Sequence, residues 1–380
     1  MVSPTFEEKQ KAYTMKQNVT RRGFIKTAGA AAVAAAAMPS GMLAAGDKTV
    51  TLAFVGGAHI HTPSFIDLVN KRQDVKVKYA WDHDAARAEK RAKALNCKVA
   101  VDSRQIWDDN EVQAVVICSE TNRHPELVAA AAKAGKHMFV EKPLGFTAEE
   151  SNRMAEGITK ANLLFTTGYF MRTDPAHLFL KDEIAKGNFG KITRVVGSNC
   201  HSGSLGGWFD TEWRWMADPQ IAGVGGFGDL GTHMLDIMLW LLGGVTSATA
   251  DIKVVTGRYG DCDESGIGLL KFKNGATGSL SAGWVDVADP VTLLLSGTEA
   301  HATINKGKLF YQCKKVQGAD GNQPFTALPA APPAPLHQFL NAVAGQKDMP
   351  LVTPQEAALR VSVMEAMYQG YRQQAWVKPA

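Results

Sequence analysis

Buried strands alternate with helices along residues 50–167, and this alternation restricts the fold more than any other feature of the chain. Val50–Val55 is apolar except for Thr51, which is typical of a strand that is buried on both faces of a sheet. The same pattern predicts further strands at residues 75–82, near 99, and at 112–118, 136–143 and 163–167. Between them it predicts helices at residues 64–70, 85–95, 103–110, 126–134 and 148–161. Such a repeat indicates a parallel, doubly wound sheet with helices on both faces.

From residue 192 onward the pattern changes to apolar and polar residues in alternation. This period of two predicts an antiparallel sheet with one covered face, with strands at residues 192–199, 248–256, 266–272, 276–284 and 291–296. The tail is expected to be helical at 335–344 and 354–373. The predicted fold is α/β: an N-terminal Rossmann domain over residues 46–170, and a C-terminal α+β domain over residues 171–380 with a large, mostly antiparallel open sheet.

The first 45 residues have the features of an export signal. Residues 20–26, TRRGFIK, resemble the twin-arginine signal, and an alanine-rich stretch at 28–37 follows that is too short to span a bilayer. Small residues at 44–46 provide a cleavage site. We therefore expect a targeting segment that takes the folded protein to the periplasm through the twin-arginine export machinery. An uncleaved N-terminal anchor is the alternative.

Charge and cysteine content exclude several classes of function. Six of the 41 Lys and Arg residues and two of the 37 Asp and Glu residues lie in residues 1–45, so the remaining chain carries 35 of each. A neutral domain without a basic patch argues against binding to nucleic acid. The five cysteines are scattered, and no Cys and His residues have the spacing of a zinc site, so neither a disulfide framework nor a metal is expected.

The turn after the first strand lies where a dinucleotide-binding G-x-G-x-x-G turn belongs. Gly56 occupies the first glycine position, whereas Ala58 and His61 replace the second and third. Asp82 follows Gly56 by 26 residues, at the end of the second strand. It either accepts the adenosine ribose hydroxyls, which favours NAD over NADP, or caps the helix at 85–95, and its position fits both roles equally.

A glycine-rich segment leads into an apolar helix at residues 225–242. Asp229, His233 and Asp236 follow each other at intervals of four and three, so they share one face of that helix. Asp229 either caps the helix or takes part in chemistry, and His233 is either a core residue or a catalyst. Asp236 is expected to be a helix-face partner.

Several stretches together resemble the Gfo/Idh/MocA family of sugar and polyol oxidoreductases. The triplet Glu141-Lys142-Pro143 combined with Asp229 and His233 after a glycine pair is the specific part. The other matching stretches are residues 50–61, 115–118 with Asn122 and His124, 134–137, 187–192, Trp213 with Arg214, Asp236, and 272–276. The resemblance covers nearly all of residues 48–375.

The resemblance implies the roles of individual residues. His233 would be the general acid/base, Lys142 would stabilise negative charge on the substrate oxygen, and Asp229 would orient the substrate. The substrate would also meet Arg172, His201, Trp213 and Arg214. NAD, rather than NADP, would be held by Gly56, Gly57, Ala58, His59, Ile60, Asp82, Ser119, Asn122, His124, Glu141 and Lys142.

The implied function is an oxidoreductase that acts on a sugar, sugar acid or polyol with a tightly bound nicotinamide cofactor. Two alternatives stay open at this point. One is a glycoside hydrolase that uses bound NAD for transient oxidation followed by elimination, and the other is a non-catalytic sugar-binding protein. Open antiparallel sheets of this type commonly pack face to face, so a homodimer or homotetramer is expected.

Overall fold

The computed structural model describes residues 49–380, and its first half forms a six-stranded sheet in the order β3-β2-β1-β4-β5-β6. All neighbouring strands in this sheet are parallel. The strands are β1 (Val50–Val55), β2 (Val75–Trp81), β3 (Lys98–Val99), β4 (Ala114–Ile117), β5 (His137–Val140) and β6 (Phe165–Thr167). The doubly wound parallel sheet predicted from the sequence is confirmed. Its strand order reverses between β1 and β4, where such sheets bind ligands.

Helices cover both faces of this sheet. Successive residues of each strand point to opposite faces, and because both sets are apolar, both faces have to be covered. Leu52 and Phe54 of β1 belong to one apolar cluster, and Ala53 and Val55 belong to another on the opposite face. The covering helices are α2 (Thr62–Asn70), α3 (Ala85–Leu95), α4 (Arg104–Trp107), α5 (His124–Lys133) and α6 (Ala148–Lys160).

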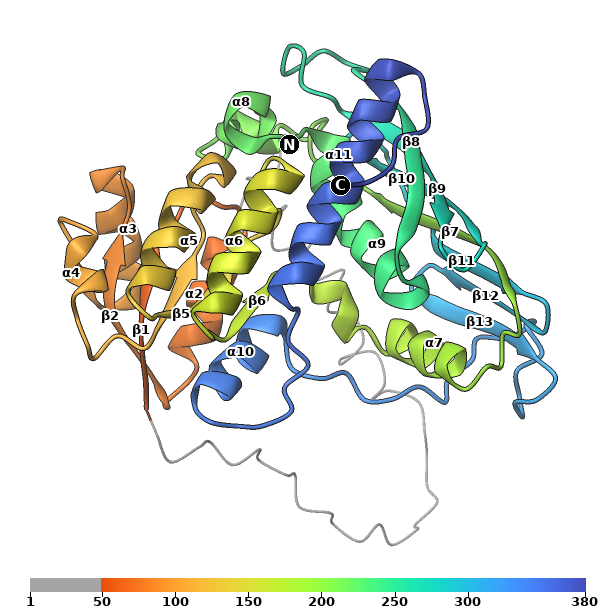
Figure 1. The fold of residues 1–380 in the computed structure, drawn as a ribbon, viewed down its shortest axis with the longest axis horizontal. Coiled ribbons are helices and arrows are strands. Elements are labelled where there is room, and N and C mark those ends of the chain that lie inside the picture. The colour runs from red at the N-terminus through yellow and green to blue at the C-terminus, as the bar shows by residue number, and fades with distance from the viewer. Residues whose placement is uncertain (1–48) are drawn as a thin grey trace, which may run out of the picture. The chain divides into compact units, whose positions relative to one another are not determined.

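Two helices from the end of the chain complete these cores. Helix α10 (Pro335–Val343) adds Leu336 and Phe339 to the cluster around Phe54, and helix α11 (Pro354–Gln373) adds Val361 to the opposite cluster. Figure 1 shows α11 between the two halves of the fold. The expected boundary near residue 170 separates the two sheets, but it leaves α10 on the first core and α11 on the cores of both sheets. As a domain division it stays a prediction.

The second half forms a seven-stranded sheet in the order β13-β12-β11-β7-β10-β9-β8. Its strands are β7 (Ile192–Cys200), β8 (Val245–Lys253), β9 (Ser265–Phe272), β10 (Thr277–Gly283), β11 (Val291–Gly297), β12 (Ala300–Asn305) and β13 (Lys308–Cys313). Only the pair β7–β10 is parallel, so the mostly antiparallel open sheet is confirmed. The hairpin of β12 and β13 was not predicted. Its two-residue turn, Lys306-Gly307, has positive φ at both residues, as in type I′ turns.

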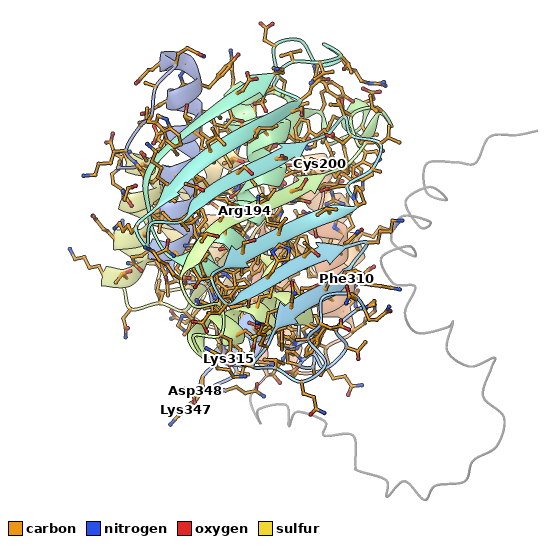
Figure 2. The ribbon with its side chains drawn as sticks, turned by 90° about the vertical axis from the view of Figure 1, so that its right-hand side faces the viewer. Arg194, Cys200, Phe310, Lys315, Lys347 and Asp348 are labelled. Atoms are coloured by element: carbon orange, nitrogen blue, oxygen red, sulfur yellow. The ribbon has the colours of Figure 1, made fainter. Side chains whose placement is uncertain are left out.

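Three helices cover one face of this sheet: α7 (Pro175–Ala185), α9 (Gly226–Leu242) and α11, whose Met367 packs against Gly268 of β9 (Figure 1). Helix α9 lies against β7 closely enough that a Cβ on Gly197 would come within 2.5 Å of Met234. Figure 2 shows the opposite face, on which strands lie open to the viewer and Arg194, Cys200 and Phe310 are labelled.

The expected targeting segment, residues 1–45, lies outside the described residues. Among residues 49–380, none of the helices combines the length and apolar character needed to cross a bilayer.

Candidate active site

The two halves of the fold meet at a buried ion pair. Lys142 follows the carboxyl end of β5, and Asp229 lies in the first turn of α9. The Lys142 Nζ atom donates to Asp229 Oδ1 over 2.7 Å, and the two side chains are 2% and 14% exposed. Two residues 87 positions apart in the sequence are thus brought into direct contact.

Asp229 is held by a second donor that the sequence did not reveal. Trp284, fully buried after the end of β10, donates its Nε1 proton to Asp229 Oδ2 over 3.1 Å. The capping role considered for Asp229 is excluded, because the N-cap residue of α9 is Gly225, and the N–H groups of Gly225 and Phe227 donate to the carboxylate of Asp263 instead. Burial alone would raise the pKa of Asp229, but the charge and hydrogen bond of Lys142 outweigh burial and hold this pKa well below its usual range.

His233 lies one turn further along α9 and is 3% exposed. Its ring packs against the rings of Tyr169 and Phe170, with centroid distances of 6.2 and 4.8 Å. Its Nδ1 atom is buried and forms no hydrogen bond with any residue in the described part. Burial, followed by the positive charge of Lys142, lowers the pKa of His233 well below 6.5. The imidazole is therefore neutral at physiological pH and has a free lone pair.

The face shared by Asp229, His233 and Asp236 continues into a structural ion-pair network. Asp236, which is fully buried, accepts from Arg172 at 2.7 and 2.9 Å and from Arg360 Nε at 2.8 Å. Arg172 also pairs with Glu356 at 2.9 Å. The guanidinium of Arg172, predicted to meet substrate, is thus committed to carboxylates of the protein itself.

The other residues predicted to meet substrate lie in different surroundings. His201 accepts from the N–H of Gly203, and its ring lies 4.9 Å from that of Trp208. Burial lowers the pKa of His201 and outweighs the charge of Asp229, which acts in the opposite direction. Trp213 is buried. Arg214 is exposed and its guanidinium lies over the ring of Tyr259 at 4.9 Å.

The turn after β1 retains the geometry of a phosphate-binding turn despite its substitutions. Gly56 has a φ of +81°, and a Cβ at this position would lie 2.6 Å from the backbone of Ser119. The N–H groups of Ala58 and Ile60 form no hydrogen bonds within the described residues, and both precede the N-terminus of α2. Free N–H groups at a helix N-terminus favour an anion such as a pyrophosphate. The residues present therefore fit a dinucleotide.

We expect Gly56→Ala to destabilise the fold by at least about 2 kcal/mol and to weaken dinucleotide binding, because alanine adds both backbone strain and a clash with Ser119. Gly135→Ala is the matched control. Gly135 has a φ of +67° but nothing lies within 4 Å of its added Cβ, so it should cost only about 1–2 kcal/mol. Urea unfolding of both variants measures the difference, and equal losses would contradict the close approach.

The carbonyl groups of the same turn are held by other elements. Arg91 of α3 donates to Gly57 O over 3.0 Å, and Trp215 Nε1 donates to Ala58 O over 3.2 Å. Trp215 belongs to a segment that the sequence did not predict, made of η3 (Trp208–Asp210), η4 (Arg214–Ala217) and α8 (Pro219–Ala222). Glu212 of this segment pairs with Arg91 at 3.3 Å. The segment thus anchors the second half of the chain to the turn.

His61, in the third glycine position, turns its side chain toward β5. Its Nδ1 atom lies 3.1 Å from Glu141 Oε1, and His59 Nε2 lies 3.8 Å from Glu141 Oε2. One ligand atom from each residue lies within 4.8 Å of the other two, so these three residues have the donors to hold a metal ion. Burial lowers the pKa of His59 to about 3, so its imidazole is neutral.

Other residues predicted to bind the cofactor lie in the loop after β4. Ser119 is buried beside Gly56, and Asn122 is exposed in η1 (Thr121–Arg123). His124 is buried, and its Nδ1 atom lies 3.1 Å from the carbonyl oxygens of both Pro143 and Leu144. His124 therefore positions the segment that carries Lys142.

Two models of one protein family match this chain. Residues 50–169 match the model described as an oxidoreductase family with an NAD-binding Rossmann fold, and residues 177–303 match the model of the GFO/IDH/MocA C-terminal domain. The chain belongs to the Gfo/Idh/MocA family. Lys142 lies in the first of the two matched regions of this family, and Asp229 and His233 lie in the second.

Curated relatives include sugar and inositol dehydrogenases. Levoglucosan dehydrogenase of Pseudarthrobacter phenanthrenivorans is 30% identical over 48% of this chain, and myo-inositol 2-dehydrogenase of Thermotoga maritima is 33% identical over 48%. The chain spans about half the length of these two relatives, 52% of each. scyllo-Inositol 2-dehydrogenase (NAD(+)) of Bacillus subtilis is 28% identical over 80% of this chain and 89% of its own.

Solved structures share the Gfo/Idh/MocA fold. Levoglucosan dehydrogenase in complex with NADH and levoglucosan superposes with a TM-score of 0.71 and 23% identity, over 87% of this chain and 99% of that one. At this identity the likeness concerns the fold alone.

Proposed function

We propose that this protein is an NAD-dependent oxidoreductase of a sugar, sugar acid or polyol. The observation that carries the proposal is the neutral, buried imidazole of His233, one helical turn from the Lys142–Asp229 ion pair. Membership in an NAD-binding oxidoreductase family and the dehydrogenase activity named for its relatives support the proposal.

Each of the three residues has a distinct role in this proposal. The neutral imidazole of His233 takes the proton of a substrate hydroxyl as the carbon is oxidised, and returns it in the reverse direction. Lys142 has N–H donors beyond the one given to Asp229 and stabilises the negative charge that develops on the oxygen. Asp229, ionised and held by Trp284, fixes the direction of the ammonium group.

The chain's own residues also define where a dinucleotide would be held. The turn at Gly56 and the free N–H groups of Ala58 and Ile60 would receive the pyrophosphate. When bound, the nicotinamide accepts or returns the hydride of the carbinol carbon.

The first test is to denature the purified, unsupplemented protein and identify the released small molecules by ultraviolet spectrum and mass. We expect about one dinucleotide for each chain, and oxidation of a sugar or polyol to a carbonyl product. A protein that contains no dinucleotide and takes up neither NAD nor NADP would overturn the proposal. Release of an aglycone without net redox change would instead support the redox-assisted glycosidase.

We propose further that the protein acts in the periplasm after export through the twin-arginine machinery. The TRRGFIK segment at residues 20–26 supports this location. Fractionation of cells that express the full chain and a variant with both Arg21→Lys and Arg22→Lys tests it. The parent should reach the periplasm and the variant should stay in the cytoplasm, whereas identical distributions would contradict the proposal.

A homo-oligomer is proposed to form through the open face of the second sheet (Figure 2). Apolar side chains are exposed on this sheet, among them Ile267 (52%) and Leu269 (44%), both of β9. Light scattering should give a multiple of the 40.9 kDa chain mass, less any cleaved signal. Joint Ile267→Lys and Leu269→Lys should shift this mass to that of one chain, whereas Val101→Lys, at a site 88% exposed near β3, should not. A monomeric parent would refute the proposal.

A further inference from the structure

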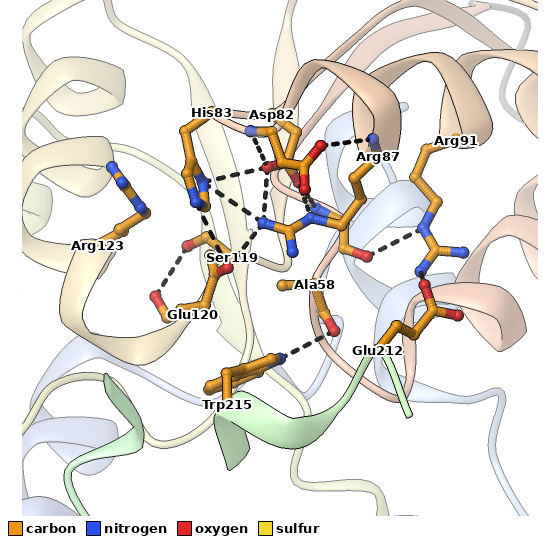
Figure 3. A network of polar contacts seen from close by, with 12 residues as sticks. Ala58, Asp82, His83, Arg87, Arg91, Ser119, Glu120, Arg123, Glu212 and Trp215 are labelled. Atoms are coloured by element: carbon orange, nitrogen blue, oxygen red, sulfur yellow. Dashed lines mark hydrogen bonds and ion pairs between the residues drawn. The ribbon is translucent and has the colours of Figure 1, made fainter. Parts of the chain in front are cut away.

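Asp82, the carboxylate at the end of β2, is already saturated by the protein. Its Oδ2 atom accepts from Gly57 N and Arg87 Nε, both over 2.7 Å. Its Oδ1 atom accepts from Arg87 Nη2 at 2.8 Å and from Asp84 N at 3.0 Å, and lies 3.2 Å from His83 Nδ1 (Figure 3). A carboxylate offers about four acceptor positions, so Asp82 has none left for a ribose. Its role is to hold Arg87 and the turn.

Glu120, unlike Asp82, has a carboxylate oxygen that is still without a donor from the described part of the chain. It follows β4 and Ser119, is 7% exposed, and its Oε1 atom accepts from Arg87 Nη2 over 2.7 Å. Its other oxygen, Oε2, is buried and has no hydrogen-bond partner among the described residues. A buried carboxylate oxygen without a donor is costly, and such an atom in a native structure calls for a ligand or a water.

The position of Glu120 indicates what that ligand is. The carboxyl ends of β1, β2 and β4 meet at the point where the strand order reverses, and Figure 3 shows Glu120 there together with Asp82 and Arg87. This crevice is where doubly wound sheets bind nucleotides. A ribose carries two adjacent hydroxyl groups, and each can donate a hydrogen bond to a carboxylate.

We propose that Glu120, and not Asp82, is the residue that receives the adenosine ribose of the dinucleotide. Arg87 bridges the two carboxylates and fixes Glu120, while Asp82 holds Arg87 through its two hydrogen bonds. This inference rests on the proposed function, because it concerns recognition of the same cofactor.

The arrangement also selects between the two dinucleotides. A 2′-phosphate offers oxygens and negative charge where Glu120 Oε2 requires a donor, so it is repelled. Arg87 offsets only part of this repulsion, because its single positive charge is shared between Asp82 and Glu120. The pocket therefore favours NAD over NADP through Glu120.

The test is titration calorimetry of the full chain, freed of cofactor, with NAD, NADP, ADP-ribose and nicotinamide mononucleotide. Glu120→Gln should raise the Kd for NAD and for ADP-ribose by about 10- to 100-fold, since it removes an acceptor of charged hydrogen bonds. The Kd for the mononucleotide, which lacks the adenosine ribose, should not change, and the preference for NAD over NADP should shrink. Glu126→Gln is the matched control, since that side chain is 60% exposed on the neighbouring helix.

The possible outcomes distinguish a failure of the Glu120 inference from a failure of the proposed function. Unchanged binding of NAD and ADP-ribose by Glu120→Gln, with a parent that binds NAD, would overturn this inference alone. A parent that binds no dinucleotide would overturn it together with the proposed function. Glu120→Asp, which keeps the charge but shortens the side chain, should bind NAD with intermediate affinity and serves if Glu120→Gln does not fold.

Discussion

Replacing His233 with asparagine is expected to lower kcat for sugar oxidation by about 10³-fold while leaving the fold intact. The imidazole is neutral and is 3% exposed, and asparagine retains a polar group of similar size but cannot take the hydroxyl proton. Steady-state kinetics with the best sugar substrate measure the loss. His177→Asn is the matched control, because His177 is another buried histidine, 4% exposed, whose Nδ1 atom contacts Met171 O.

The pH dependence provides an independent check on the same residue. Because the pKa of His233 lies well below 6.5, its base form persists through neutral pH, and kcat/KM for oxidation should fall only at markedly acidic pH. Lys142→Met removes a positive charge that disfavours protonation of His233. This change raises the pKa of His233, so the acidic limb should move to higher pH. A parent profile that breaks near 6.5 would contradict the role of His233.

The sequence predicts those parts of the fold whose signal is local. The mainly apolar segment Val50–Val55 and the alternation of serine with buried Leu280 and Ala282 in Thr277–Gly283 identify strands, because the period of side-chain burial is visible in the sequence itself. Strand β12 was missed because two of its three buried positions carry small side chains, Ala300 and Ala302, so its alternation is faint before Ile304. The segment with η3, η4 and α8 has no regular period to detect.

The sequence predicts those residues of the candidate site that belong to motifs. It does not predict the contacts between residues that are far apart in the chain. Lys142, Asp229 and His233 were found by their resemblance to a family pattern, and the structure brings Lys142 and Asp229 together. No local pattern reveals that Trp215 contacts Ala58, 157 positions away, or that Trp284 contacts Asp229. Such contacts depend on tertiary packing, which leaves no periodic trace in the sequence.

Replacing Asp236 with asparagine is expected to cost the largest share of stability of any single change in this site. Asp236 is fully buried and is the common partner of Arg172 and Arg360, whose side chains are 11% and 2% exposed. The isosteric change removes the negative charge that the two buried guanidinium groups share and puts a neutral amide in its place. Breaking a buried ion pair from one side costs about 3–5 kcal/mol, and the low end applies here because Glu356 still faces Arg172 at 2.9 Å.

Urea unfolding and thermal melts of Asp236→Asn measure this loss, and Asp251→Asn is the matched control. Asp251 forms an ion pair with Lys253 in which both side chains are about two-thirds exposed (66% and 65%), so its loss should cost less than about 1 kcal/mol. Asp236 lies two turns along α9 from Asp229, on the same face as His233. If its network fixes that helix, the variant should lose activity at temperatures below its unfolding transition. A variant as stable as Asp251→Asn would show that the two arginines are solvated without Asp236, and the network would then have no part in holding the site.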